Sequence, residues 1–231
     1  MAALATYKDL CIDAVDPVRL GEFWAAVLGL EADRLDDGDL VLRGRTPQHA
    51  IWVNRVPEPV TVKQRVHLDV HAAATDDVLA LGATPDDLTS FRWKVVRDPE
   101  GGELCVFERE TVPDDRLYEI VVDAVDHERI ARWWADALGA TFDTDAESGF
   151  SWVEQIPGAP FEGLVFVPVP EPRTVKNRIH WDVDTESVDA LVAAGAVVLR
   201  QRDDEIQWSV LADPEGNEFC AFTPEPGRQP A

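Results

Sequence analysis

The spacing of apolar residues near the amino terminus predicts a strand followed by a helix. Residues 7–15 alternate, imperfectly, between apolar and polar side chains, as a half-buried strand does. Asp16 precedes Pro17 in the manner of a helix N-cap, and Gly29 is a typical helix stop. Between them, an apolar stripe at helical spacing is formed by Leu20, Phe23, Trp24, Val27 and Leu28.

Three more units of the same βαβββ plan are predicted, which gives an α+β fold rich in strands. The first unit is completed by strands around Arg34 and at 40–44 and 50–56. The second has a strand at 65–70, a helix from Thr75 as N-cap to Gly82, and strands at 91–97 and 103–109. The third has a strand at 118–125, a helix from Asp126 as N-cap to Gly139, and strands at 151–155 and 163–167. The fourth has the strand of His180, a helix from Thr185 as N-cap to Gly195, and strands at 205–212 and 218–223.

The two halves of the chain are copies of each other. The segment VPEPVTVKQRVHLDV at residues 56–70 recurs as VPEPRTVKNRIHWDV at 169–183, with eleven of fifteen positions identical. Further matches at nearly the same offset are DAVD at 13–16 and 123–126 and DPEG at 98–101 and 213–216. Collinear matches of this length indicate a tandem duplication of a whole domain. The predicted division is a first domain (1–110), a linker (111–116), a second domain (117–224) and a carboxyl-terminal tail (225–231).

Composition narrows the classes of function. The 231 residues carry a formal net charge of −23, whereas binding to nucleic acid or to an anionic membrane needs clusters of Lys and Arg. The charge either keeps the protein soluble or draws in a cationic ligand. Only three cysteines occur, without a C-x-x-C pair, so a disulfide framework is not expected. Because no apolar run reaches about 18 residues, a cytoplasmic protein is predicted.

The polar faces of the predicted strands carry the candidate chemistry. The helix of a βαβββ unit covers one sheet face, and two units that join their sheets can curl the bare faces into a cup. The polar residues on these faces are Asp9, His67 and Cys105, with the counterparts Glu119, His180 and Cys220 in the second half. Each trio is a donor set that zinc accepts.

A combination of motifs repeats along with these residues. They are D-P-x-x-L-x-x-F-W-x-x-x-L-G at 16–29, D-x-x-R-I-x-x-W-W-x-x-x-L-G at 126–139, R-V-H-L-D at 65–69, R-I-H-W-D at 178–182 and the two DPEG turns. The chain thereby resembles the glyoxalase/bleomycin-resistance/extradiol-dioxygenase family, the vicinal oxygen chelate superfamily, and most of all its tandem glyoxalase-like domain proteins. The resemblance implies two tandem vicinal-oxygen-chelate domains, each of paired βαβββ units that form a curled, cup-like mixed sheet. Each cup is built either from neighbouring units or from units exchanged between the halves.

The resemblance also implies a divalent metal, such as Zn, Ni, Mn or Fe, held by four side chains from the first and last strands of two units. The equivalent first-strand positions are Asp9, His67, Glu119 and His180. The last-strand positions, where the family typically has Glu, are Cys105 and Cys220, and those of the other units fall near Asn54 and Val167. Val167 cannot bind a metal, so the familiar set of four ligands is broken.

The same residues have plainer interpretations. His67 and His180 can be satisfied by Asp69 and Asp182, two positions further along each strand. A free cysteine often behaves as a small buried hydrophobic residue. A nucleophilic thiolate would need a nearby cation, such as a protonated His67, to lower its pKa.

A small hydrophobic or aromatic molecule is the expected ligand, because aromatic walls with a few polar anchors suit a planar compound. The residues expected to bind it are Trp52, Asn54, Asp69, Trp93, Trp181, Asp182 and Trp208. The repeated basic residues Lys63, Arg65, Lys176 and Arg178 either hold an anionic group or pair with Glu58 and Glu171.

Three functions are compatible with these residues and motifs. The first is a glyoxalase/bleomycin-resistance-type protein that sequesters or transforms a small molecule in its cup. The second is a divalent-metal-dependent lyase or isomerase of the same superfamily. The third is a non-catalytic interaction module. In each case neither nucleic acid nor a membrane is an expected partner, and the chain is either a monomer that contains its own pseudo-dimer or a homodimer.

Overall fold

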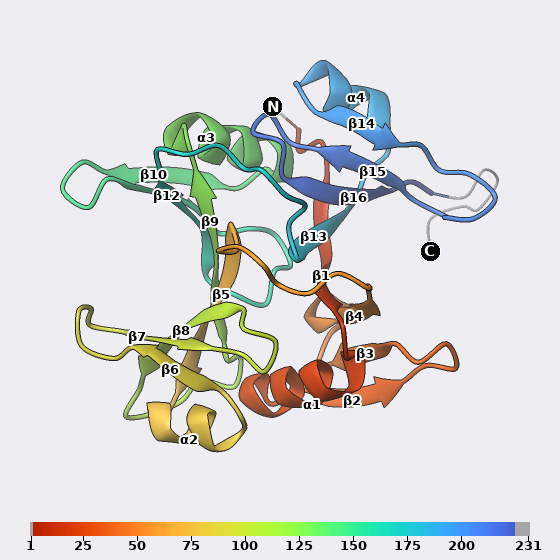
Figure 1. Cartoon of the computed structure of the whole chain (residues 1–231). Coiled ribbons are helices and arrows are strands. Elements are labelled where there is room, and N and C mark those ends of the chain that lie inside the picture. Colours follow the sequence, from red (N-terminus) through yellow and green to blue (C-terminus); the bar gives the residue numbers. More distant parts are fainter. Residues whose placement is uncertain (1, 225–231) are drawn as a thin grey trace.

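The computed structural model describes residues 2–224, so the tail expected at 225–231 lies outside the described range. Within that range the chain forms sixteen strands and four α-helices in two eight-stranded sheets (Figure 1). The sheets are mixed, with both parallel and antiparallel neighbours. The α+β fold class predicted from the pattern of strands and helices is therefore confirmed.

Each of the four units has the predicted βαβββ order. Unit one contains β1 (Thr6–Ala14), α1 (Pro17–Leu28), β2 (Glu31–Arg34), β3 (Leu40–Arg43), a short 3-10 helix (Pro47–His49) and β4 (Ile51–Arg55). Unit two contains β5 (Val66–Ala72), α2 (Thr75–Ala80), β6 (Thr84–Asp87), β7 (Lys94–Arg97) and β8 (Glu103–Glu108). Unit three contains β9 (Leu117–Ala124), α3 (His127–Leu138), β10 (Thr141–Asp145), β11 (Phe150–Glu154) and β12 (Gly163–Pro168). Unit four contains β13 (Ile179–Asp184), α4 (Val188–Ala193), β14 (Val197–Arg200), β15 (Ser209–Ala212) and β16 (Glu218–Phe222).

The two sheets join units from different halves of the chain. Sheet A has the order β14-β15-β16-β13-β1-β4-β3-β2 and combines units four and one. Sheet B has the order β10-β11-β12-β9-β5-β8-β7-β6 and combines units three and two. At the centre of each sheet the first strands of two units pair antiparallel, β1 with β13 and β5 with β9. Units are therefore exchanged between the halves, which answers the question that the sequence left open.

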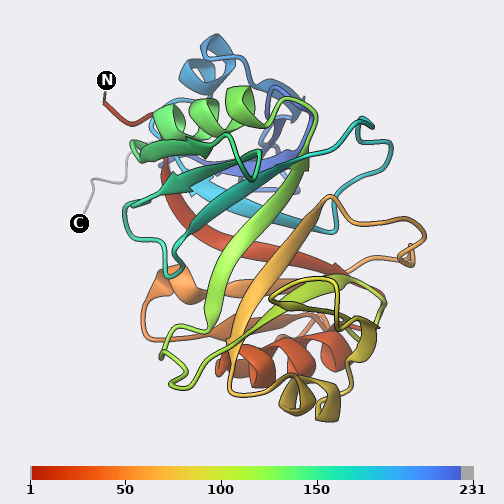
Figure 2. The ribbon, with the colours of Figure 1, turned by 90° about the vertical axis from the view of Figure 1, so that its left-hand side faces the viewer.

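Each half nevertheless keeps its helices together. Helices α1 and α2 lie at one end of the molecule, and α3 and α4 lie at the other (Figure 1). The central strands run between these two ends, as the quarter-turned view also shows (Figure 2). The helices are therefore grouped by sequence half, whereas each sheet joins units from different halves.

The two long helices begin and end where the sequence predicts. The carboxylate of Asp16 accepts a hydrogen bond from the backbone N–H of Arg19, and Asp126 caps α3 in the same way. Gly29 ends α1 in the left-handed region, at a φ of 69°. This conformation favours glycine because it has no Cβ.

The predicted caps of the two short helices are wrong. Thr75 is the first residue of α2 rather than its N-cap, and the carboxylate of Glu108 on β8 accepts hydrogen bonds from its backbone N–H and hydroxyl. Ser187 rather than Thr185 caps α4. In both places a tertiary or neighbouring partner replaces the residue that the local sequence favoured.

Three edge strands were not predicted. They are β6, β10 and β14, which lie at sheet edges and are mostly exposed. Because neither face is fully buried, their residues lack the alternation that reveals a half-buried strand.

The repeated DPEG turns connect the units within each half. The carboxylate of Glu100 accepts hydrogen bonds from the backbone N–H groups of Val15 and Asp16 at the start of α1, at 2.9 and 2.7 Å. Glu215 does the same for the start of α3. Gly101 has the positive φ, 88°, expected for the turn. The motif thus supplies both a turn and an acid for a positively polarised helix N-terminus.

The segments between β4 and β5 (56–65) and between β12 and β13 (169–178) are called the connectors. Their basic residues link the halves. Lys63 contacts Asp123 with an Nζ–Oδ2 distance of 2.6 Å, and Lys176 contacts Asp13 at 2.5 Å. The expectation that these residues pair with the carboxylates of Glu58 and Glu171 is wrong. Only the backbone carbonyls of those two glutamates are used, and they accept hydrogen bonds from Arg178 and Arg65.

Candidate functional site

Sheet A brings one imidazole, one carboxylate and two thiols together, and we call Cys11, His180, Asp182 and Cys220 the sheet-A cluster. The Nε2 atom of His180 lies 3.5 Å from Sγ of Cys220 and 3.6 Å from Oδ1 of Asp182. Sγ of Cys11 lies 3.7 Å from Oδ2 of Asp182. All four residues are buried. The cluster requires the exchange of units, because Cys11 belongs to unit one and the other three to unit four.

Asp9 adds a second carboxylate beside this cluster. It stands directly opposite Asp182 in the pairing of β1 with β13. Its Oδ2 accepts hydrogen bonds from Nζ of Lys8 at 2.5 Å and from Nε1 of Trp52 at 3.0 Å. The ammonium group of Lys8 therefore pairs with Asp9, which stands directly opposite the buried carboxyl group of Asp182.

Burial favours the neutral form of every group in the sheet-A cluster. Desolvation, reinforced by the charge of Asp9, raises the pKa of Asp182 well above its usual range. Burial, together with Asp182, also raises the pKa values of the Cys11 and Cys220 thiols. Burial lowers the pKa of His180 to about 4. The thiols and the imidazole are therefore neutral near pH 7, which argues against the thiolate nucleophile considered from the sequence.

Sheet B carries a smaller version of the same arrangement. Nε2 of His67 lies 3.4 Å from Oδ1 of Asp69 and 3.6 Å from Sγ of Cys105. Val121 stands opposite His67, where sheet A has Cys11 opposite His180. We call His67, Asp69 and Cys105 the sheet-B cluster, which thus has one thiol fewer.

Glu119 is the additional buried acid of sheet B. It stands opposite Asp69 in the pairing of β5 with β9. Burial, together with the charge of Asp69, raises the pKa of Glu119 to about 8. A neutral carboxyl group therefore lies beside the sheet-B cluster at physiological pH.

Three residues of the sheet-A cluster, Cys11, His180 and Asp182, form a donor set that suits a zinc ion. Zinc binds thiolate, imidazole and carboxylate atoms tetrahedrally at about 2.0–2.3 Å, which separates neighbouring ligand atoms by about 3.4–3.8 Å. Three separations in the cluster, 3.5, 3.6 and 3.7 Å, lie within that range. The donors that all lie within 4.8 Å of one another are those of Cys11, His180 and Asp182. The sheet-B cluster offers three donors and would leave one position open. In both sheets the imidazole is next to the predicted cysteine, but the neighbouring carboxylate is that of Asp182 or Asp69 rather than that of Asp9 or Glu119.

Both sheets have a β-bulge on a central strand, at the end of the polar face that we call the mouth of the cup, but the bulged residue differs. The register of β1 shifts between Tyr7 and Asp9, which releases Lys8, and the register of β9 shifts at Tyr118. A bulge re-aims a side chain. Nζ of Lys8 consequently lies 4.2 Å from the ring centroid of Phe222, whereas the ring of Tyr118 contacts the equivalent Phe107.

The mouth of sheet B is filled by its own aromatic side chains. They form a continuous row, with ring centroids 4.5–5.5 Å apart, of Phe91, Trp93, Phe107, Tyr118 and His71. Such contacts between rings stabilise the row beyond the burial of their area.

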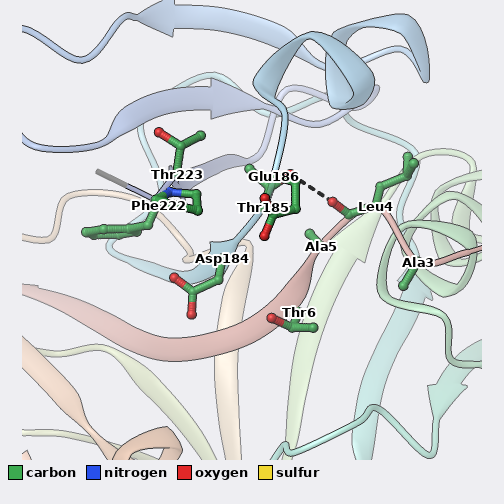
Figure 3. A pocket seen from close by; sticks show the side chains of 10 residues that line it. Ala3, Leu4, Ala5, Thr6, Asp184, Thr185, Glu186, Phe222 and Thr223 are labelled. Carbon is green, nitrogen blue, oxygen red and sulfur yellow. Dashed lines mark hydrogen bonds between the residues drawn. The ribbon is translucent and has the colours of Figure 1, made fainter. Parts of the chain in front are cut away.

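The corresponding end of sheet A has a cavity of about 300 Å³ (Figure 3). Its walls include Leu4, Thr6, Asp184 and Phe222, and Trp208 stacks on Phe222 with ring centroids 5.4 Å apart. Asp184 and Phe222 follow Asp182 and Cys220 by two positions on the same strands. Because alternate residues share a sheet face, the cavity borders the face that carries the cluster.

The structure separates the metal-ligand sets that the sequence grouped by domain. Asp9 lies in sheet A, whereas His67 and Cys105 lie in sheet B. In the same way Glu119 lies in sheet B, away from His180 and Cys220 in sheet A. His67 lies near Asp69 and His180 lies near Asp182, at 3.4 and 3.6 Å, but neither pair forms a hydrogen bond, so these aspartates do not satisfy the imidazoles.

The residues expected to bind a ligand are also divided. Trp52 and Trp208 lie at sheet A, Trp93 lies in the aromatic row of sheet B, and Asn54 is half-buried on β4 opposite Asp13. The expectation for Trp181 is wrong. Its side chain is 1% exposed and packs 4.8 Å from Trp134 in the core, because alternation directs it away from the face of its strand neighbours.

Two residues of the site were missed by sequence reasoning. Cys11 lies two positions after Asp9 and therefore on the same strand face, so the alternation itself contained this signal. Lys8 reaches the site only through the bulge, and the local sequence carries no sign of that irregularity.

The chain matches one known family of domains in both of its halves. The sequence profile described as the Glyoxalase-like domain matches residues 9–107 and again 119–222. The chain therefore belongs to the Glyoxalase-like domain family, within the vicinal oxygen chelate superfamily, and contains two copies of the domain. A comparison with curated protein sequences found no match. Among the residues that the structure describes, no helix is long and apolar enough to cross a membrane.

Solved structures share the fold. Glyoxalase I from Zea mays aligns with a TM-score of 0.66 at 14% identity, over 95% of this chain and 92% of that chain. A putative dioxygenase from Bacillus subtilis also aligns with a TM-score of 0.66, at 15% identity, over 98% of this chain and 87% of its own. The cppA protein from Streptococcus pneumoniae has a TM-score of 0.52 at 11% identity, with 94% and 98% covered. At these identities the likeness concerns the fold alone.

Proposed function

We propose that this protein binds a small molecule at the mouth of sheet A, with a planar hydrophobic part against Phe222 and a polar group directed at the sheet-A cluster. The observation that carries the proposal is the cavity of about 300 Å³ that borders the face of the cluster. A ligand of this kind would use the aromatic wall for contact area and the buried polar groups for orientation.

The unsatisfied polar atoms of sheet A support this proposal. Within the described residues, Oδ1 of Asp9, Nδ1 of His180 and Oδ1 of Asp182 are buried without a hydrogen-bond partner. A buried polar atom that lacks a partner costs about 1–3 kcal/mol. A ligand that supplies the missing donors and acceptors would recover part of this free energy, so polar and planar groups in one molecule are favoured.

Isothermal titration calorimetry with naphthol, a planar bicyclic phenol, tests the proposal. We expect binding that weakens at least about tenfold in a Trp208→Ala/Phe222→Ala variant, because each stacked aromatic contact contributes about 0.5–1.5 kcal/mol in addition to its buried area. The matched control is Trp93→Ala/Phe107→Ala at sheet B, which should bind naphthol as the parent does. Equal loss in both variants, or no binding of naphthol to the parent, would count against the proposal.

A second candidate function is divalent-metal-dependent lyase or isomerase chemistry in the same cup. The donor set of Cys11, His180 and Asp182 favours it, and Sγ of Cys220 lies 3.5 Å from Nε2 of His180 beside this set. A zinc ion bound there would polarise an oxygen atom of a substrate. These side chains would hold the ion, and the aromatic wall would position the substrate beside it.

Metal analysis tests this second candidate. Protein purified without chelators should contain zinc at close to one ion per chain, and a Cys11→Ser/His180→Ala variant should lose it. The matched control, Cys105→Ser/His67→Ala, changes the same residue types in sheet B and should retain the ion. A parent protein without metal that also fails to take up added zinc would contradict the metal-dependent function. If naphthol binding is absent as well, the interaction module considered from the sequence becomes the favoured interpretation.

A further inference from the structure

The two connectors enclose a second cavity, of about 750 Å³. Its walls come from both copies of the most strongly repeated stretch of the chain, at residues 56–65 and 173–178, together with Asp13, Asp123, Val169 and Glu171. The volume lies within the range of about 300–1,000 Å³ typical of small-molecule sites. None of the residues of the sheet-A cavity lines it, so it is independent of the proposed function.

The basic residues of this cavity already have acidic partners. The ion pairs, with their N–O distances, are Lys63–Asp123 at 2.6 Å, Lys176–Asp13 at 2.5 Å, Arg173–Glu218 at 2.6 Å, Arg178–Glu100 at 3.0 Å and Arg65–Asp123 at 3.6 Å. The carboxylates of Asp13 and Asp123 are buried. An anionic ligand would have to displace these acids and leave them buried without a partner, which is strongly unfavourable.

The repeated residues that do not take part in the ion pairs include two acids and two exposed valines. Glu58 and Glu171 line the cavity, and within the described part of the chain their carboxylates form neither an ion pair nor a hydrogen bond. Val62 and Val175 also line it, and their side chains are 46% and 47% exposed. Each connector contributes one residue of each kind. The links between the halves account for the repeated Lys and Arg, but they do not use these four side chains.

We propose that this cavity binds an organic cation with a hydrocarbon part, such as an alkyl amine or a diamine. Its ammonium group would pair with Glu58 or Glu171, and its hydrocarbon part would pack on Val62 and Val175. The arrangement of one acid and one valine from each connector suits a diamine, which presents a charge at both ends of an apolar chain. The net charge of −23 further attracts a cation.

Calorimetry with octamethylenediamine and suberate tests this inference, since the two compounds have similar length and opposite charge. We expect the diamine to bind and suberate not to bind. In a Glu58→Gln/Glu171→Gln variant, diamine affinity should fall at least about tenfold, because each lost contact is a charge-assisted hydrogen bond, which is stronger than a neutral one.

The matched control changes the net charge equally at another place. Glu31 and Glu110 are exposed, and neither lines the connector cavity. A Glu31→Gln/Glu110→Gln variant should therefore keep the affinity of the parent within about twofold at moderate salt, where distant surface charges are screened. The inference is overturned if the diamine fails to bind, if suberate binds as well as the diamine, or if both variants lose affinity equally. Naphthol binding at sheet A is unaffected by any of these outcomes, so the two proposals fail separately.

Discussion

Cys11 and His180 are direct partners in the antiparallel pairing of β1 with β13, although they come from opposite ends of the chain. The equivalent partner of His67 in sheet B is Val121. The duplication has therefore produced two cups with the same plan and different chemistry. Sheet A has a second thiol and a cavity, whereas sheet B has an apolar residue and a continuous row of aromatic rings.

This difference predicts which sheet binds zinc more tightly. Replacing Cys11 with Val copies the composition of sheet B into sheet A and removes one donor. Loss of supporting residues around a metal typically costs about 10–100-fold in affinity, so loss of a direct ligand should cost at least about 100-fold. The measurement is competition with a chelating dye. The reciprocal Val121→Cys variant should strengthen binding at sheet B, and unchanged affinities in both variants would refute the assignment.

Glu119 predicts a pH dependence of stability. Its pKa in the folded protein is about 8, against an ordinary value of 4.5. The folded state therefore holds the proton more tightly than the unfolded state does, so the stabilisation is fully present below the unfolded pKa and is lost as pH rises towards 8. The side chain of a Glu119→Gln variant stays neutral at every pH in this range. Between pH 5 and pH 8, we expect the free energy of unfolding of the variant to rise by about 3–4 kcal/mol relative to the parent.

Urea unfolding of chelator-treated protein at a series of pH values measures this difference. Glu110→Gln serves as the control, because this side chain is exposed and its substitution should leave the difference flat. A flat profile for Glu119→Gln would show that the carboxyl group ionises normally beside Asp69.

Substitution of Trp181 is expected to reduce the stability of the protein strongly without a direct effect on naphthol binding. Trp181 is fully buried and packs against Trp134, so Trp181→Ala should lower the free energy of unfolding by about 3–5 kcal/mol. Trp208 is half-buried, so Trp208→Ala should lower the free energy of unfolding by less, about 1–2 kcal/mol. This variant should nevertheless bind naphthol more weakly. Chemical denaturation of both variants, with calorimetry of the folded fraction, separates the two roles. A stable Trp181→Ala variant that has lost naphthol binding would reverse the assignment.

The contacts of Glu100 indicate that the DPEG turn also stabilises the start of α1 and the connector that carries Arg178. The carboxylate of Glu100 accepts two backbone hydrogen bonds at the start of α1 and pairs with Arg178 at 3.0 Å. Glu100→Ala should lower the free energy of unfolding by about 2–3 kcal/mol, because charge-assisted hydrogen bonds are stronger than neutral ones. Thermal unfolding checks this, with Glu110→Ala as the control expected to change stability by less than about 0.5 kcal/mol. Equal effects of the two substitutions would contradict the role.

Much of the fold could be predicted from sequence because its signals are local. The apolar stripe of α1, with Asp16 and Gly29 at its ends, can be recognised directly in the sequence, and so can the duplication. The short exposed strands β6 and β14 could not be predicted, because they are specified by pairing with a neighbour rather than by their own alternation.

The composition of the site could be predicted only in part. His180 and Cys220 were placed on a polar strand face by alternation, and they do lie 3.5 Å apart. Their partner from unit one depended on which units share a sheet, and that long-range choice leaves no local trace. The bulge at Lys8 is equally non-local, since it arises from the register of β1 against β13.

A crystal structure of the protein with naphthol would test the binding site at sheet A without any inference from variants. We expect density for the ring system in the cavity bordered by Asp184 and Phe222, with the hydroxyl group directed at the polar face that carries Asp182. Naphthol density confined to sheet B, to the connector cavity or to the outer surface would contradict the proposed function.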